Sequence, residues 1–257
     1  MRNLQFRWWA LTVLAVLTVG AIGGSVARAN DPSSPPPSKY APADDLVTYL
    51  RQLLKRMGSD LSDAEDYGEE EQQRVTMRAY TVVAIALVLE CHDSPHSLKS
   101  VARRLIESAT QLADHADDFE KARAAYDRLS ELAAQDHDSS GKRGEWEPVA
   151  DIAELMKAVP IINNQMRRGI QSRRFARSAE RTAVYAAALA AVAQASLVDD
   201  SYCGDEEDFA KWQKLCAEMR DGAAAAARAV RAGDQEEAKR QAANIVKTCD
   251  ACHEDFR

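Results

Sequence analysis

The sequence ends in Cys249-Asp250-Ala251-Cys252-His253-Glu254-Asp255-Phe256-Arg257, and this stretch constrains the fold more than any other. Within it, Cys-x-x-Cys-His is the attachment sequence of a c-type haem, in which two thiols form thioethers and the imidazole binds the iron. In a helix the three residues stand at i, i+3 and i+4, so they project from one face towards one porphyrin. The stretch therefore predicts a final helix that carries one covalent haem; a chance cluster is the alternative.

The N-terminus predicts export. Arg2 and Arg7 precede an apolar stretch at 8–24, and Ala27-Arg28-Ala29 has the small-x-small form of a signal-peptide cleavage site. We expect residues 1–29 to be a signal peptide and the mature chain to begin near Asn30. An uncleaved membrane anchor is the alternative, but a run of about 17 residues broken by glycines is short for a span. Because c-type haem is attached after export in bacteria, both signals predict the periplasm.

The charge of the chain excludes some classes of partner. The sequence has 33 Lys and Arg against 40 Asp and Glu, a formal net charge of −7. Cleavage after Ala29 would remove three arginines and no acid, so the mature chain would be more negative. An acidic protein is poorly suited to nucleic acid or anionic membranes. We expect redox partner proteins, no nucleic acid, and no membrane after signal cleavage.

Three cysteines lie outside the motif, at Cys91, Cys203 and Cys216. An oxidising compartment permits disulfides, and a Cys203–Cys216 bond would close a short loop between two expected helices. The other possibility is that both are small buried hydrophobic residues. Cys91 has no evident mate, and together with His92 and His96 it offers too few ligands for a closed metal site.

Polar interruptions divide a sequence that otherwise reads as amphipathic helix, rich in Ala, Leu, Arg and Glu. Residues 30–43 form a Pro/Ser-rich linker with no capacity to form a core, and residues 135–147 form a second linker. No segment shows the alternation of a strand. The sequence therefore predicts an all-α fold with helices at 44–58, 71–91, 96–115, 118–134, 148–169, 173–197, 206–231 and 235–256.

The expected helices form two similar sets of four. The segments 117–120 and 234–237 both fit an Asp-x-x-Glu capping box at the start of a final helix, which gives an offset of 117 residues. We predict a degenerate four-helix bundle without a haem motif at 44–134 and a haem-binding bundle at 148–257, with two unrelated bundles as the alternative. Under this offset the first set lacks the motif, because Leu132, Gln135 and Asp136 stand opposite Cys249, Cys252 and His253.

A four-helix bundle that ends in Cys-x-x-Cys-His-x-x-Phe-Arg resembles the cytochrome c′ family, the class II c-type cytochromes. The resemblance covers 148–257 well and 44–134 faintly, and the C-terminal place of the motif is its specific part. It implies two tandem antiparallel four-helix bundles, the second with one haem c. It also implies His253 as the proximal iron ligand, Cys249 and Cys252 as thioether anchors, and Arg257 as the arginine beside the proximal histidine.

The resemblance also indicates the residue on the other side of the iron. In the family this position lies on the first helix of the bundle, where a methionine ligates the iron or an apolar residue leaves it five-coordinate. Aligning the segment 154–157 (Glu-Leu-Met-Lys) with methionine-ligated members makes Met156 the candidate distal ligand, and Met/His ligation raises the reduction potential. Met156 can equally be a core residue, and Met166 and Met219 are weaker candidates.

The sequence departs from the family's pattern at Ile152, where members commonly carry an arginine that pairs with a haem propionate. The propionates would then be solvated or paired elsewhere. Pro160 is expected to kink its helix. Six arginines near the next helix junction supply either the propionate partner or, as we prefer, a solvated basic face: Arg167, Arg168, Arg173, Arg174, Arg177 and Arg181.

These features favour an exported one-electron carrier, not an enzyme, with nitric oxide or carbon monoxide binding at a five-coordinate haem as the alternative. A peroxidase would need a polar distal acid or base, and the sequence offers no histidine or carboxylate pair for that role. A scaffold with a vestigial motif is a further alternative. Family members often pair through their first two helices, so we expect either a homodimer or an intramolecular pseudo-dimer in which the haem-free copy replaces the second subunit.

Overall fold

The computed structural model describes residues 35–135 and 137–256, and all regular structure in these ranges is helical, which confirms the all-α prediction. The predicted signal peptide, its cleavage site and Arg257 lie outside the described residues. Within the described part, no helix has the length and apolar character to cross a membrane. In chain order the helices are η1 (Pro37–Lys39), α1 (Ala43–Asp60), α2 (Glu69–Glu90), η2 (Lys99–Val101), α3 (Ala102–Asp114), α4 (Phe119–Ala134), α5 (Ile152–Ile170), α6 (Phe175–Ser196), α7 (Glu206–Arg231) and α8 (Gln235–Asp255).

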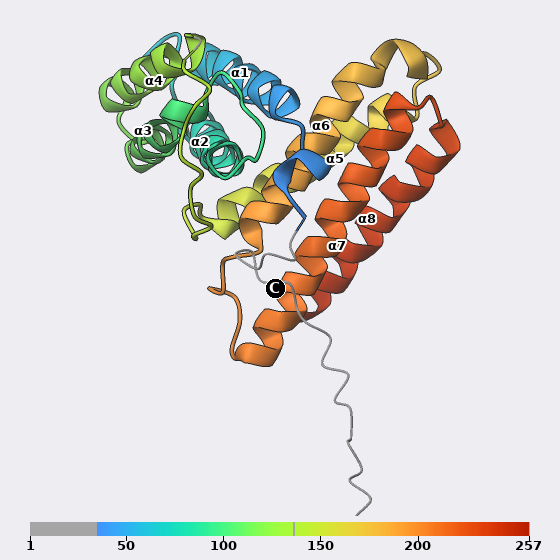
Figure 1. The fold of residues 1–257 in the computed structure, drawn as a ribbon. Coiled ribbons are helices and arrows are strands. Elements are labelled where there is room, and N and C mark those ends of the chain that lie inside the picture. Colours follow the sequence, from blue (N-terminus) through green and yellow to red (C-terminus); the bar gives the residue numbers. More distant parts are fainter. Residues whose placement is uncertain (1–34, 136, 257) are drawn as a thin grey trace, which may run out of the picture.

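Helices α1–α4 gather on one side of the molecule and α5–α8 on the other (Figure 1). Within each set, helices that follow one another in the chain pack together. The first two helices of each set also meet, because α6 contacts α1 and α2, and α5 contacts α2. Buried side chains from both sets form one continuous core.

Helices α2 and α6 are buried around most of their circumference. Every residue of α2 from Thr81 to Leu89 is buried, as is every residue of α6 from Thr182 to Ser196. A helix without a polar face is stable only when other helices surround it, and this explains why these two lie where the sets meet. The ring of Tyr49 on α1 contacts that of Tyr185 on α6 edge to face, with centroids 6.0 Å apart.

Aspartate caps begin the last helix of each set. Asp234 accepts a hydrogen bond from the backbone N–H of Glu237 at 2.9 Å, as the sequence predicted. In the other predicted box, however, the cap is Asp118, which accepts from the N–H of Lys121 at 3.2 Å. The two caps are 116 positions apart, which gives a register one residue away from the predicted offset of 117. This register places His137 opposite His253, but α4 has already ended at Ala134.

Both predicted linkers contact the helices at some of the positions that the structure describes. Tyr40, near the end of the Pro/Ser-rich segment, is only 3% exposed. Its ring lies 5.2 Å from the guanidinium carbon of Arg220 on α7, a cation–π contact between the two sets. In the second linker, the N–H of Gly144 donates to the carbonyl of Glu90 at 3.1 Å. The first linker therefore does contribute to the core, because its aromatic residue brings the apolar area that its prolines and serines lack.

The turn after α2 caps the C-terminal end of that helix. The ring Nε2 of His96 bonds the carbonyl of Leu89 at 2.8 Å, and Lys99 Nζ donates to the carbonyl of Glu90 at 2.8 Å. Carbonyls in the last turn of a helix have no intrahelical donor, so these side chains satisfy them. For this reason α3 begins at Ala102, later than the predicted start at residue 96.

We expect the protein to lose stability on acidification because of His96. Burial lowers the pKa of His96 from 6.5 to about 4, and its Nδ1 has no hydrogen-bond partner among the described residues. The unfolded chain binds this proton at a higher pH than the folded chain does. The free energy of unfolding should therefore fall as the pH drops from 6.5 to about 4, by roughly 1–2 kcal/mol.

Urea titrations across this pH interval measure the effect. The His96→Gln variant should lose this part of the pH dependence. The matched control is His115→Gln, which removes an exposed imidazole and leaves His96 in place. Equal slopes in the two variants would contradict the assignment to His96.

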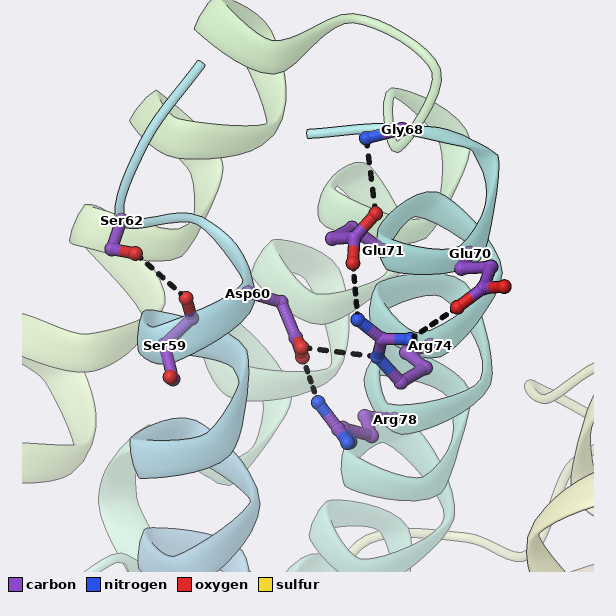
Figure 2. A network of polar contacts seen from close by, with 8 residues as sticks. All are labelled: Ser59, Asp60, Ser62, Gly68, Glu70, Glu71, Arg74 and Arg78. Atoms are coloured by element: carbon purple, nitrogen blue, oxygen red, sulfur yellow. Dashed lines mark hydrogen bonds and ion pairs between the residues drawn. The ribbon is translucent and has the colours of Figure 1, made fainter. Parts of the chain in front are cut away.

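A polar network joins the end of α1 to the start of α2 (Figure 2). Asp60 accepts from Arg74 Nε at 3.1 Å and also pairs with Arg78. Glu71 accepts from the N–H of Gly68 at 3.1 Å, which caps α2, and it pairs with Arg74. Because the Asp60 side chain is only 11% exposed, the two arginines supply the compensation that its buried charge requires.

The Asp60→Ala substitution is expected to lower the free energy of unfolding by about 2 kcal/mol, because it leaves two part-buried arginines without this partner. The Asp63→Ala control removes an exposed aspartate three residues later and should cost less than about 1 kcal/mol. Chemical denaturation of both variants provides the comparison. If both variants lost the same free energy of unfolding, the Asp60 network would stabilise the protein no more than an exposed aspartate does.

Candidate functional site

The second half of α8 is only partly covered by the other helices. Its buried residues are Ala238, Ala242 and Ile245, all in the first half of the helix. From Val246 to Asp255 no residue of α8 is buried. A bundle helix normally buries an apolar stripe along its whole length, so α8 is packed at its start and open at its end.

The three motif residues lie on this open part. Cys249, Cys252 and His253 all line one cavity of about 300 Å³. Their i, i+3, i+4 spacing on a continuous helix places them on one face, as the sequence predicted. The structure therefore brings two thiols and an imidazole together on a single wall.

Helices α5, α6 and α7 form the other walls, which are mainly apolar: the lining includes Val159, Ala193, Trp212 and Leu215. A second cavity of about 270 Å³ adjoins the first. The two share four lining residues, which are Met156, Trp212, Cys252 and His253. We refer to these two adjoining cavities together as the hollow. Its mainly apolar lining suits a flat apolar group that is attached to α8.

The structure separates the three candidate distal methionines. Met156 on α5 is half-buried and lines both cavities with His253. Met219 on α7 lines only the first of these two cavities, and Met166 is fully buried in the core and lines neither. Met156 therefore has the best access to a group held by His253.

Pro160 does not end α5, which runs from Ile152 to Ile170. Proline has no N–H, so the carbonyl four residues earlier, that of Met156, lacks its helical donor. Pro160 also lines the first cavity. The effect of the proline is thus local, and it falls on the backbone of the candidate distal ligand.

Polar side chains at the cavity also fit a ligand with polar substituents. Asn163 is 9% exposed, lines the cavity, and its Oδ1 has no hydrogen-bond partner among the described residues. A buried acceptor without a partner costs free energy, so a bound group with a polar edge would relieve it. Arg167 lines the same cavity, whereas Ile152 lines the second cavity as an apolar residue. The five other arginines near the junction are exposed: Arg168, Arg173, Arg174, Arg177 and Arg181.

The cysteines near the cavity are free thiols. Burial raises the pKa of Cys252 to about 11 and raises the pKa of Cys249 above its ordinary value. The thiols are therefore protonated at neutral pH and less reactive than thiolates. Cys216 also lines the cavity, and burial raises its pKa. It forms no disulfide with Cys203 in the structure.

The described residues contain no group of three or more His, Cys, Asp or Glu side chains that could hold a metal ion. In particular, His92 Nε2 bonds the carbonyl of Ala41 at 3.1 Å and His96 Nε2 bonds that of Leu89. Each of these histidines therefore already uses its Nε2 in a hydrogen bond to a backbone carbonyl, one just before α1 and the other near the end of α2.

A family model described as Cytochrome C' matches residues 206–257. The matched segment comprises α7, α8 and the motif, and so includes two walls of the cavity. No curated protein and no solved structure matches the chain. The match supports the resemblance of this segment to c-type cytochrome haem proteins of that family; helices α1–α6 lie outside it.

Among the cavity-lining residues that were not singled out from the sequence, Asn163 and Trp212 matter most. Asn163 follows Met156 by seven residues, which is two helical turns, so periodicity alone could have placed it on the same face. Trp212 precedes Cys216 by one turn of α7 and donates from Nε1 to the carbonyl of Ser196 at 2.8 Å. The sequence offered Met219 on α7 only as a weaker distal candidate, although Trp212 precedes it by seven residues and so lies on the same helix face.

Proposed function

We propose that the chain is an exported c-type cytochrome that carries one covalent haem c and transfers single electrons. The observation that carries this proposal is the open half of α8, where Cys249, Cys252 and His253 line a largely apolar cavity. The family match to residues 206–257 supports it independently of the cavity.

Each residue of the site has a separate role in this proposal. Cys249 and Cys252 would hold the haem through thioether bonds, and His253 would supply the proximal nitrogen ligand. When bound, the haem supplies reversible one-electron chemistry at its iron. The apolar walls limit water, and Met156 would supply a soft sulfur ligand that raises the reduction potential. No side chain is required to transfer a proton, so the protein is proposed as a carrier and not as an enzyme.

A pyridine haemochrome spectrum and an intact mass test the proposal on protein made with a haem-attachment system. We expect the spectrum of a haem with two thioether bonds, and colour that stays with the chain after acid extraction. Release of all the colour, or the mass of the bare polypeptide, would refute the proposal.

The alternative function is gas binding, and two features of α5 are consistent with it. Pro160 deprives the Met156 carbonyl of its helical donor, and the Met156 side chain is only half-buried, so Met156 is held less firmly than a core residue. If the sulfur is easily displaced, carbon monoxide or nitric oxide would bind the ferrous iron. Carbon monoxide titration distinguishes the two: an unchanged ferrous spectrum supports the carrier, and a rapid shift supports gas binding.

We also infer that α1–α4 form a haem-free copy that replaces a second subunit. Its support is the packing of α1 and α2 against α5 and α6, together with an ion pair of 2.7 Å between Asp45 on α1 and Arg231 on α7. This arrangement would leave the full chain monomeric. Sedimentation equilibrium tests it, and a stable homodimer formed through α5 and α6 would contradict it.

The periplasmic location rests on the sequence of residues 1–29. N-terminal sequencing of protein recovered from a bacterial periplasm should give a chain that starts near Asn30. Protein retained in the cytoplasm with Met1 intact would contradict the proposal.

A further inference from the structure

An aromatic pair connects the cavity wall to the surface. Trp212 is 3% exposed, lines both cavities and is fixed by its hydrogen bond to the carbonyl of Ser196. Tyr202 stacks on it with ring centroids 6.4 Å apart and an angle of 10° between the planes. Tyr202 is 46% exposed, which is unusual for a large hydrophobic side chain among the described residues. The second cavity is lined by both rings, so the hollow approaches solvent beside Tyr202.

The segment that carries Tyr202 is strongly acidic. Between Val198 and Ala210 the sequence has no Lys, Arg or His. The nearest cation along the chain, Lys211, is paired with Asp255 at 2.6 Å. The same segment contains six carboxylates, none of them buried: Asp199, Asp200, Asp205, Glu206, Glu207 and Asp208. Some of them cap the start of α7, but capping does not neutralise their charge.

We propose that this acidic, aromatic surface is the docking face for a basic electron-transfer protein. The inference rests on the proposed function, since it needs a haem in the hollow. The negative charge of this surface indicates the kind of partner, because it attracts a cationic protein and steers it to the face. A second copy of this chain, related by a two-fold axis, would bring the same carboxylates against one another. Tyr202 and Trp212 then supply a packed contact between the partner and the hollow.

Oxidation of the ferrous protein by small complexes of opposite charge tests the position of the face. With tris(phenanthroline)cobalt(III), a trication, one electron leaves the ferrous iron and reduces cobalt(III) to cobalt(II), without transfer of a proton. Ferricyanide, a trianion, takes one electron in the same direction and becomes ferrocyanide. Stopped-flow measurements at low ionic strength give both rates, and a haemochrome spectrum of each variant first establishes that haem is present.

The test variant is Asp200→Asn/Glu206→Gln/Glu207→Gln, which leaves the capping residue Asp205 intact. Its rate with the cobalt complex should fall about tenfold, and its rate with ferricyanide should rise, because the steering charge is reduced. The matched control removes three exposed carboxylates from the α1–α2 loop and α3, Glu65→Gln/Asp66→Asn/Glu107→Gln, and should change either rate less than about twofold. Equal effects of the two triple variants, or no effect of the first, would overturn the proposal.

A second measurement does not depend on electron transfer. Tris(ethylenediamine)chromium(III), a paramagnetic trication, should broaden the amide NMR signals of residues 200–204 more than those of residues 63–67. Stronger broadening at 63–67 would overturn the docking face even in a haem-loaded protein. Concentration-dependent dimerisation that Tyr202→Ala abolishes would also overturn it, in favour of a second copy as occupant. Haemochrome-negative protein would instead mark failure of the proposed function itself.

Discussion

Replacing both Cys249 and Cys252 by alanine is expected to remove all covalently held haem while leaving the helical fold intact. Neither side chain is buried in the core, and α8 is anchored by Ala238, Ala242 and Ile245 instead. The free energy of unfolding of the haem-free chain should therefore change by less than about 1 kcal/mol. Haemochrome absorbance after acid extraction measures the attached haem, and far-ultraviolet circular dichroism measures the helix content.

The single variants and two other cysteines sharpen this prediction. Cys249→Ala or Cys252→Ala alone should leave one possible thioether, which shifts the haemochrome band relative to the parent. Cys91→Ala and Cys203→Ala change cysteines outside the motif and should retain haem at the parental level. Covalent haem in the double variant, or its loss in Cys203→Ala, would contradict the assignment of the attachment residues.

The sequence was sufficient for features that depend on local rules. Helical periodicity located the eight α-helices found in residues 35–135 and 137–256, and the spacing of the final motif correctly placed Cys249, Cys252 and His253 on one face. The Asp234 cap also follows a local pattern. These properties involve residues within two turns of each other, and no tertiary contact overrides them.

Tertiary packing decided the features that sequence reasoning missed. The runs at 81–89 and 182–196 were expected to be amphipathic, but they are surrounded because the two sets of helices meet there. Tyr40 is buried by a contact with Arg220, which lies far away in the chain. The sequence predicted Asp117 as the cap of α4, but the structure has Asp118 in that position. Either of these adjacent aspartates suits a helix N-cap. In the first two cases the sequence permits several outcomes, and contacts with distant residues select one.

Among the methionines of the hollow, Met156 should have the largest influence on the iron. If Met156 is the distal ligand, Met156→Ala should abolish the methionine charge-transfer band in the ferric spectrum and convert the haem from low spin to high spin. Loss of the soft sulfur ligand should also lower the reduction potential, by on the order of 0.1 V, because axial ligands tune this potential over a wide range. Ferric absorption spectra and a redox titration measure both effects.

Two other methionines serve as controls for different explanations. Met219→Ala also removes a thioether from the cavity lining, so it tests whether any change in the polarity or volume of the cavity alters the spectrum. Met166→Ala creates a hole in the packed core, where the side chain is fully buried, and should cost about 2–4 kcal/mol of stability without changing the charge-transfer band. If Met156→Ala kept the methionine charge-transfer band and Met219→Ala lost it, the distal ligand would be Met219 on α7. A parent protein that is already high-spin in the ferric state would favour gas binding, since an iron without a sulfur ligand has a free coordination position.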